Sequence, residues 1–206
     1  MSCGKFSKGG RLTPLPEPAM DSTVKSAVSA RVRVLRTALV AALVLAWPIR
    51  AVVGEVSERY MLALNLTESL PERAFWIERV GAAGEARTPR EVLDGLSYGD
   101  RIAFLVGEGA REHYRPETVF VKKVKGLPGQ TVTVNEDRIV HIDGQPVAKA
   151  REQSRSGLPL QPIEGGVIPE GKVFVWTPHE DSYDSRYADI GLVDSARLIG
   201  TARFSF

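Results

Sequence analysis

The sequence predicts a mainly β domain, in the form of a closed or partly closed β-barrel, behind an N-terminal transmembrane helix. Short runs rich in β-branched and aromatic residues alternate with turn signals from Tyr60 onward, and only one helix is expected among them. An uncharged apolar segment from Thr37 to Ile49 follows a basic stretch, which is typical of a membrane-inserted helix. With 206 residues and 43% hydrophobic content, the chain can bury one main core.

Residues 1–33 are predicted to form a disordered, basic tail on the cytoplasmic side of a membrane. Residues 1–19 are rich in Gly, Pro and Lys without hydrophobic periodicity, and Met20 is a plausible alternative start. Residues 1–36 hold seven Lys/Arg against two acidic residues, a net charge of +5, so that the remainder carries −3 of the total of +2. A slightly acidic body binds nucleic acid poorly, and we expect no nucleic-acid partner.

A transmembrane anchor is expected over residues 34–53. The apolar run has 13 residues, fewer than the roughly 20 that span a bilayer, but it continues past Arg50, whose side chain can reach the membrane surface. Two alternatives stay open: a signal sequence that is removed, and a buried helix of a soluble protein. The preceding basic residues predict a cytoplasmic N-terminus and an exported body. The one cysteine, Cys3, precedes the apolar run, so the body has no disulfide.

Several strands are predicted from residue 60 to the C-terminus. They cover residues 74–80, 101–106, 117–125, 131–134, 138–142, 171–178 and 197–206. The spacing of Asn135 to Asp137 indicates a hairpin between the fourth and fifth of these strands, and Asp143-Gly144 indicates a further turn.

One helix is predicted to begin at Pro89. Thr88 is its expected N-cap, Glu91 completes a capping box, and Gly95 follows where the helix should end. The polar, turn-rich stretch 150–166 is expected to be a long surface loop inserted into the β-rich domain.

Period-two alternation distinguishes the three lysines of strand 117–125. Successive strand side chains point to opposite faces, so Lys122 shares a face with Phe120 and Val124, while Lys123 lies on the other. Lys122 is therefore the candidate for burial. The alternative is that its face is exposed, and a one-residue bulge would reverse the assignment. Burial disfavours a charged amine, and a neutral amine can serve as general base for a hydroxyl nucleophile.

Three blocks of the sequence, in order, resemble the type I signal peptidase family of membrane-anchored Ser/Lys proteases. They read NLTESLP at residues 65–71, VFVKKVKGLPGQ at 119–130 and HEDSYDSRY at 179–187. The likeness is greatest to the conjugative-transfer signal peptidases of the TraF type, which share SLP and SxDSRY and lack a large inserted domain. The resemblance implies a signal-peptidase-like β-barrel catalytic domain over residues 60–206.

The resemblance also implies the catalytic groups. Ser69 matches the nucleophile and Lys122 the general base, in agreement with the strand alternation. Thr67 matches the position whose hydroxyl helps the Ser69 backbone amide to bind the oxyanion, and such preorganised donors stabilise charge that develops in the transition state.

Three further residues are implied to support these groups. Ser182 matches the residue whose hydroxyl holds the lysine amine in line, and Asp184 with Arg186 matches a supporting ion pair. A neutral hydroxyl can orient the amine without raising its pKa as a carboxylate would. The histidines lack metal-ligand spacing, so no metal or cofactor is expected.

The expected function is that of a membrane-anchored serine endopeptidase of the signal peptidase type, cleaving exported precursors such as a conjugative pilin precursor. Further expected partners are membrane lipid and components of a conjugation or type IV secretion apparatus. The expected location is the bacterial inner membrane, with the catalytic domain on the periplasmic side. Two alternatives are a catalytically silent, membrane-tethered β-barrel scaffold of such an apparatus and a LexA-like self-cleaving regulator. The regulator would need a DNA-binding domain in place of the apolar segment.

Overall fold

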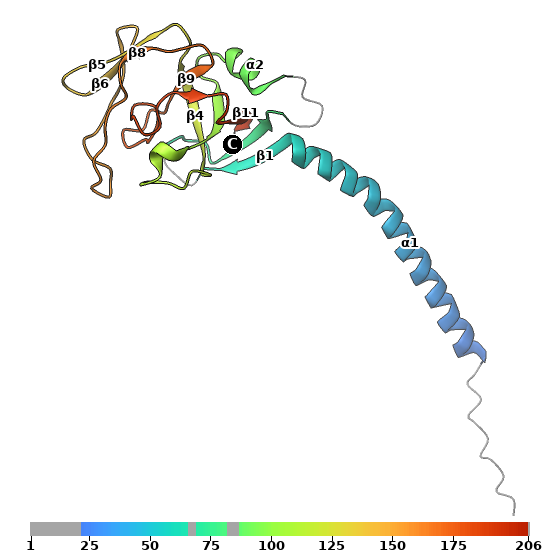
Figure 1. The fold of residues 1–206 in the computed structure, drawn as a ribbon. Helices are drawn as coiled ribbons and strands as arrows, with labels where there is room; N and C mark the ends of the chain where they lie inside the picture. Colours follow the sequence, from blue (N-terminus) through green and yellow to red (C-terminus); the bar gives the residue numbers. More distant parts are fainter. Residues whose placement is uncertain (1–21, 66–68, 82–86, 206) are drawn as a thin grey trace, which may run out of the picture. The chain divides into compact units, whose positions relative to one another are not determined.

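The computed structural model describes residues 22–65, 69–81 and 87–205 (Figure 1). The chain divides into two compact units, Met1–Ala51 and Val52–Phe206.

Helix α1 (Ser22–Arg59) contains the apolar segment, with Pro48 inside it. The part from Arg31 to Arg59 has 29 residues and contains an 18-residue window with a mean hydropathy of 1.9, so its length and composition suit a membrane span. Its large apolar side chains are exposed, with Leu35 at 73%, which leaves a surface that lipid would cover. A signal sequence would have the same properties, so that alternative stays open.

The start of α1 differs from the sequence prediction. Residues 22–33 are helical, whereas the disordered tail was expected to extend to residue 33. This stretch holds neither Gly nor Pro, and its Ala, Lys and Arg residues favour a helix, which explains the earlier start. The predicted disorder of residues 1–21 lies outside the described residues.

The second unit contains two antiparallel sheets, which confirms the mainly β fold class. The larger sheet has seven strands in the order β1-β2-β11-β3-β4-β9-β10, and the smaller has four in the order β7-β6-β5-β8. The strands are β1 (Tyr60–Leu64), β2 (Ala74–Arg79), β3 (Arg101–Leu105), β4 (Val119–Gly126), β5 (Thr131–Val134), β6 (Ile139–Ile142), β7 (Gln145–Lys149), β8 (Gly166–Val167), β9 (Lys172–Trp176), β10 (Val193–Asp194) and β11 (Leu198–Ser205). Strands β1, β7, β8 and β10 were not predicted from the sequence.

Local sequence signals set several connections, as predicted. β5 and β6 pair across the turn that begins at Asn135. Asp143 and Gly144 both adopt positive φ, 49° and 75°, in the turn between β6 and β7. Helix α2 (Pro89–Asp94) begins with the predicted capping box, in which the Thr88 side chain accepts from the Glu91 amide while the Glu91 side chain accepts from the Thr88 amide. A short 3-10 helix, η1 (Glu108–Ala110), follows β3.

The stretch 150–166 connects β7 to β8, with isolated bridges and only its last residue in a strand. It is anchored more firmly than a surface loop need be, because Ala150, Leu160 and Ile163 are buried in the hydrophobic clusters. Pro162 also pairs with Tyr187 in one of the bridges. This stretch is therefore held against the segment that carries the SxDSRY sequence.

The largest hydrophobic cluster fixes the strand that carries Lys122. It packs residues of α2, β3, β4 and β9 together, among them Ile102, Val124 and Val175. Val124 lies two residues after Lys122 on the same face of β4, so burial of this valine also directs the lysine side chain inward.

Gly200 lies where β11 approaches β2 closely. A Cβ atom at this position would be 2.0 Å from the backbone oxygen of Glu78 and 2.9 Å from Ile77 Cγ2, so the two strands would have to separate. We expect Gly200→Ala to lower the free energy of unfolding by about 2 kcal/mol or more. Urea unfolding measures this, with the exposed Ser205→Ala in the same strand as a control. Equal stability of the two variants would contradict the close approach.

Candidate active site

Lys122, which strand alternation makes the candidate for burial, faces the interior of the β domain. Its side chain is buried, with 4% exposure, and so is Val124, whereas Lys123 and Lys125 are half-exposed. The pairing of β4 with β9 does contain a register shift, but it falls between Val124 and Gly126, after Lys122. The alternation is therefore intact at the lysine.

Burial is the dominant influence on the charge of Lys122. Loss of solvation lowers the pKa of its amine from the ordinary 10.5 to about 8, while Asp184 acts to raise it and Arg186 to lower it further. The Phe120 ring, whose centroid lies 5.2 Å from Nζ, forms part of this apolar surround. On the order of a tenth of the molecules therefore carry a neutral amine at pH 7, against a negligible fraction for an exposed lysine.

One buried hydroxyl group contacts the amine, and a second buried hydroxyl group contacts the first. Lys122 Nζ donates a hydrogen bond of 2.9 Å to Ser182 Oγ. Thr177 Oγ1 donates to the same Ser182 oxygen at 2.5 Å. The predicted contact between Ser182 and the lysine is thus present, whereas nothing in the sequence indicated Thr177, which lies outside the SxDSRY block.

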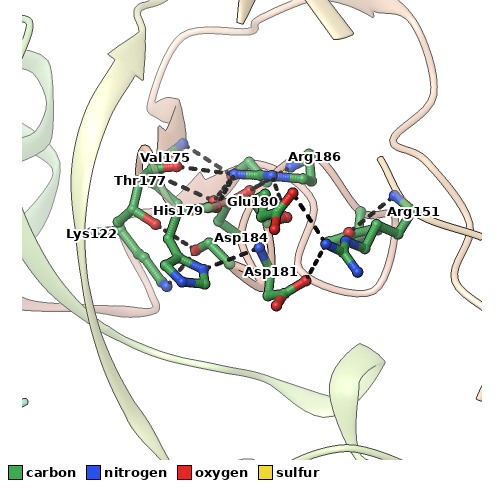
Figure 2. A network of polar contacts seen from close by, with 12 residues as sticks. Lys122, Arg151, Val175, Thr177, His179, Glu180, Asp181, Asp184 and Arg186 are labelled. Atoms are coloured by element: carbon green, nitrogen blue, oxygen red, sulfur yellow. Dashed lines mark hydrogen bonds and ion pairs between the residues drawn. The ribbon is translucent and has the colours of Figure 1, made fainter. Parts of the chain in front are cut away.

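Asp184 and Arg186 form a buried, bidentate ion pair. The distances are 2.8 Å from Arg186 Nε to Asp184 Oδ1 and 3.0 Å from an Arg186 terminal nitrogen to Asp184 Oδ2. The Arg186 side chain is 2% exposed and the Asp184 side chain 0%. Arg186 also donates to the backbone carbonyls of Thr177, His179 and Glu180. Figure 2 shows this network running from Lys122 and Thr177 at one end to Arg151 at the other. The pair holds the loop between β9 and Ser182.

The segment that carries Ser69 is tied together by Asn65. The Asn65 side-chain amide donates to the carbonyls of Leu70 and Glu72, both at 2.9 Å, and its backbone amide donates to Arg73 at 2.8 Å. Leu70, the residue after Ser69, is buried in a small core cluster and anchors this part of the segment. Thr67 lies in the segment 66–68, outside the described residues, so its oxyanion role stays a prediction.

One cavity of about 340 Å³ brings the three sequence blocks together. Ser69, Lys122 and Ser182 all line it, whereas Asp184 and Arg186 do not. Its walls also contain residues that sequence reasoning did not assign, among them Tyr114, Phe120, Arg155, His179 and Tyr183. A hydroxyl and an amine of lowered pKa on one cavity have the chemistry of acyl transfer.

Within the described ranges, no cluster of three or more His, Cys, Asp or Glu residues could hold a metal ion. His179 lines the cavity, and its Nδ1 accepts a hydrogen bond from the Asp181 backbone amide at 3.1 Å. Asp181 in turn pairs with Arg151 at 2.8 Å and with Arg155 at 2.7 Å. These two arginines connect the 150–166 stretch to the cavity wall.

Comparison with known proteins gives consistent matches. The family model described as signal peptidase, peptidase S26, matches residues 31–206. Conjugal transfer protein TraF of Agrobacterium fabrum is 41% identical over 85 residues, which are 40% of this chain, and the chain spans 46% of the length of that relative. Signal peptidase I of Bacillus licheniformis is 32% identical over 177 residues, covering 82% of this chain and 85% of that protein. Among solved structures, a signal peptidase I of Enterococcus faecalis is 24% identical, with a TM-score of 0.32, and covers 52% of this chain and 95% of that one.

Proposed function

This chain belongs to the signal peptidase, peptidase S26, family, and from this membership we propose that it is a membrane-anchored serine endopeptidase that cleaves exported precursor proteins. The observation that carries the proposal is the cavity lined by Ser69, Lys122 and Ser182, in which burial lowers the pKa of the lysine amine to about 8. Ser69 is the proposed nucleophile and Lys122 the proposed general base.

The proposed reaction has two steps. Ser69 Oγ attacks the scissile carbonyl carbon while its proton passes to the neutral amine of Lys122, and the resulting ammonium protonates the leaving amine as the peptide C–N bond breaks. Water then attacks the acyl ester, its proton passes to Lys122, and the return of that proton to Ser69 Oγ releases the new carboxyl terminus. Ser182 keeps the amine in line in both steps through its 2.9 Å hydrogen bond.

The proposed setting is the bacterial inner membrane, with α1 as anchor and the β domain on the periplasmic side. The apolar character of α1 and the basic residues before its apolar part support this orientation. The likeness to a conjugal transfer protein supports a place in conjugation. The proposed substrate is a conjugative pilin precursor, and the proposed further partners are components of a conjugation apparatus. If the acyl group passes to the terminal amine of the same cleaved chain, in place of water, the product is a ring that lacks one water.

Ser69→Ala is expected to abolish cleavage, because the acyl acceptor is removed. Full-length wild-type and variant proteins, in membranes, are incubated with candidate pilin precursors, and product masses are compared. A shortened product from wild type alone is the expected result, and a mass one water lower identifies a ring. The exposed Ser97→Ala, outside the cavity, is the matched control. Cleavage by Ser69→Ala at the wild-type rate would overturn the proposal, and absence of cleavage by wild type would favour the scaffold alternative.

A further inference from the structure

We propose that Thr177 is a positioning residue, which holds the amine of Lys122 in its reactive orientation by acting through Ser182. The inference rests on the proposed Ser/Lys peptidase function and adds to it a residue outside the three sequence blocks. Thr177 follows β9 directly, is 0% exposed and does not line the cavity, so it cannot touch a bound precursor. Its effect on the reaction must pass through its neighbours.

The Ser182 side-chain oxygen accepts two hydrogen bonds. A serine oxygen offers two acceptor lone pairs. Lys122 donates to it at 2.9 Å and Thr177 at 2.5 Å, so both acceptor positions are filled. Serine has three staggered rotamers of similar energy, and a turn to either of the other two would break both hydrogen bonds. Thr177 therefore selects the rotamer in which Ser182 faces the lysine.

Thr177 is itself held in place. Its backbone amide donates to Asp184 Oδ2 at 3.2 Å, and its carbonyl accepts from Arg186 at 3.0 Å. Its β-branched side chain restricts χ1 further. The buried ion pair thus fixes Thr177, Thr177 fixes Ser182, and Ser182 fixes the amine.

Such a chain of hydrogen bonds suits a lysine base. Lysine has a flexible four-carbon stem, so its amine needs an external constraint. A carboxylate in direct contact would supply one but would raise the pKa of the amine, whereas hydroxyl groups add no charge. The ion pair acts from behind two hydroxyls, where the opposed effects of Asp184 and Arg186 on the amine partly cancel.

The test is a double-mutant cycle on full-length protein in detergent micelles, with precursor cleavage as the readout. Thr177→Val removes the hydroxyl and keeps the shape, and we expect kcat to fall by about 10- to 100-fold with little change in KM. Thr177→Ser restores the hydroxyl and should stay within about 3-fold of wild type. In a Ser182→Ala background, Thr177→Val should cost less than about 2-fold, because its partner is already absent.

Thermal unfolding of each variant shows whether it folds, and Thr177→Ala replaces Thr177→Val in the cycle if the valine variant does not. The inference would be overturned if Thr177→Val had the kcat of wild type. It would also be overturned if Thr177→Val lowered kcat by the same factor with Ser182 and with Ser182→Ala. Absence of Ser69-dependent cleavage by the wild-type protein would instead overturn the proposed function and the inference with it. If the wild type cleaves the precursor and loss of the Thr177 hydroxyl leaves kcat unchanged, the inference is overturned and the proposed function stands.

Discussion

Lys122→Met is expected to abolish precursor cleavage and, at neutral pH, to make the folded protein more stable. A general base commonly contributes about 10²- to 10⁴-fold to the rate, and methionine has no basic group. The pKa of Lys122 falls from the ordinary 10.5 to about 8 in the folded protein. This difference means that burying the charged amine costs about 3 kcal/mol of folding free energy. Methionine of similar length relieves that cost, so one substitution should separate activity from stability.

The two effects depend on pH in different ways. Cleavage by the wild type should rise as the pH increases through about 8, because the neutral amine is the form that acts as base in the proposed reaction. Between about 8 and 10.5 the unfolded chain keeps the Lys122 proton that the folded protein has released, so wild-type stability rises with pH across this window. The gain in free energy of unfolding of Lys122→Met over wild type is therefore complete below about pH 8 and lost above about pH 10.5.

Lys123→Met is the matched control for both measurements, because Lys123 is the adjacent residue on the opposite, half-exposed face of β4. It should cleave precursor normally and unfold like wild type. Cleavage rates and urea unfolding of the three proteins at several pH values make the comparison. Robust cleavage by Lys122→Met would exclude Lys122 as the base, and an unchanged free energy of unfolding would contradict its costly burial.

Arg186→Met is expected to lower the free energy of unfolding by about 3–5 kcal/mol. The substitution leaves the Asp184 carboxylate, which is 0% exposed, without its cationic partner. It also leaves the backbone carbonyls of Thr177 and Glu180 without their arginine donor, and cleavage should fall together with stability.

The double variant Asp184→Leu/Arg186→Met should recover part of that stability, because it removes both charges and not one. Arg155→Ala is the surface comparison: this arginine is 70% exposed in its ion pair with Asp181, so its loss should change the free energy of unfolding by about 1 kcal/mol or less. Urea unfolding of the four proteins gives the free energies. If Arg186→Met were as stable as wild type, the ion pair would not hold this loop.

The local features of this protein could be predicted from its sequence because they depend on neighbours along the chain. The capping box of α2, the Asp143-Gly144 turn and the strands through Phe75, Phe104 and Val175 follow from spacing and residue type. Alternation along β4 made Lys122, and not Lys123, the candidate for burial, but it left open which face of the strand lies inward. The packing of Val124 in the core decides that. The short strands β8 and β10 escaped prediction, because two residues carry no period.

The composition of the site was decided by tertiary packing. Lys122 and Ser182 are 60 residues apart in the chain, and only the pairing of β4 with β9 brings them within a hydrogen bond. Sequence blocks could indicate these two residues as members of one site, but not Thr177, whose proposed positioning role depends on a hydroxyl contact and on a buried ion pair. The anchoring of the 150–166 stretch is of the same kind, because the buried positions that hold it belong to cores formed by distant strands. Patterns along a chain record which face a residue prefers, whereas the partner it meets there depends on how the sheets pack.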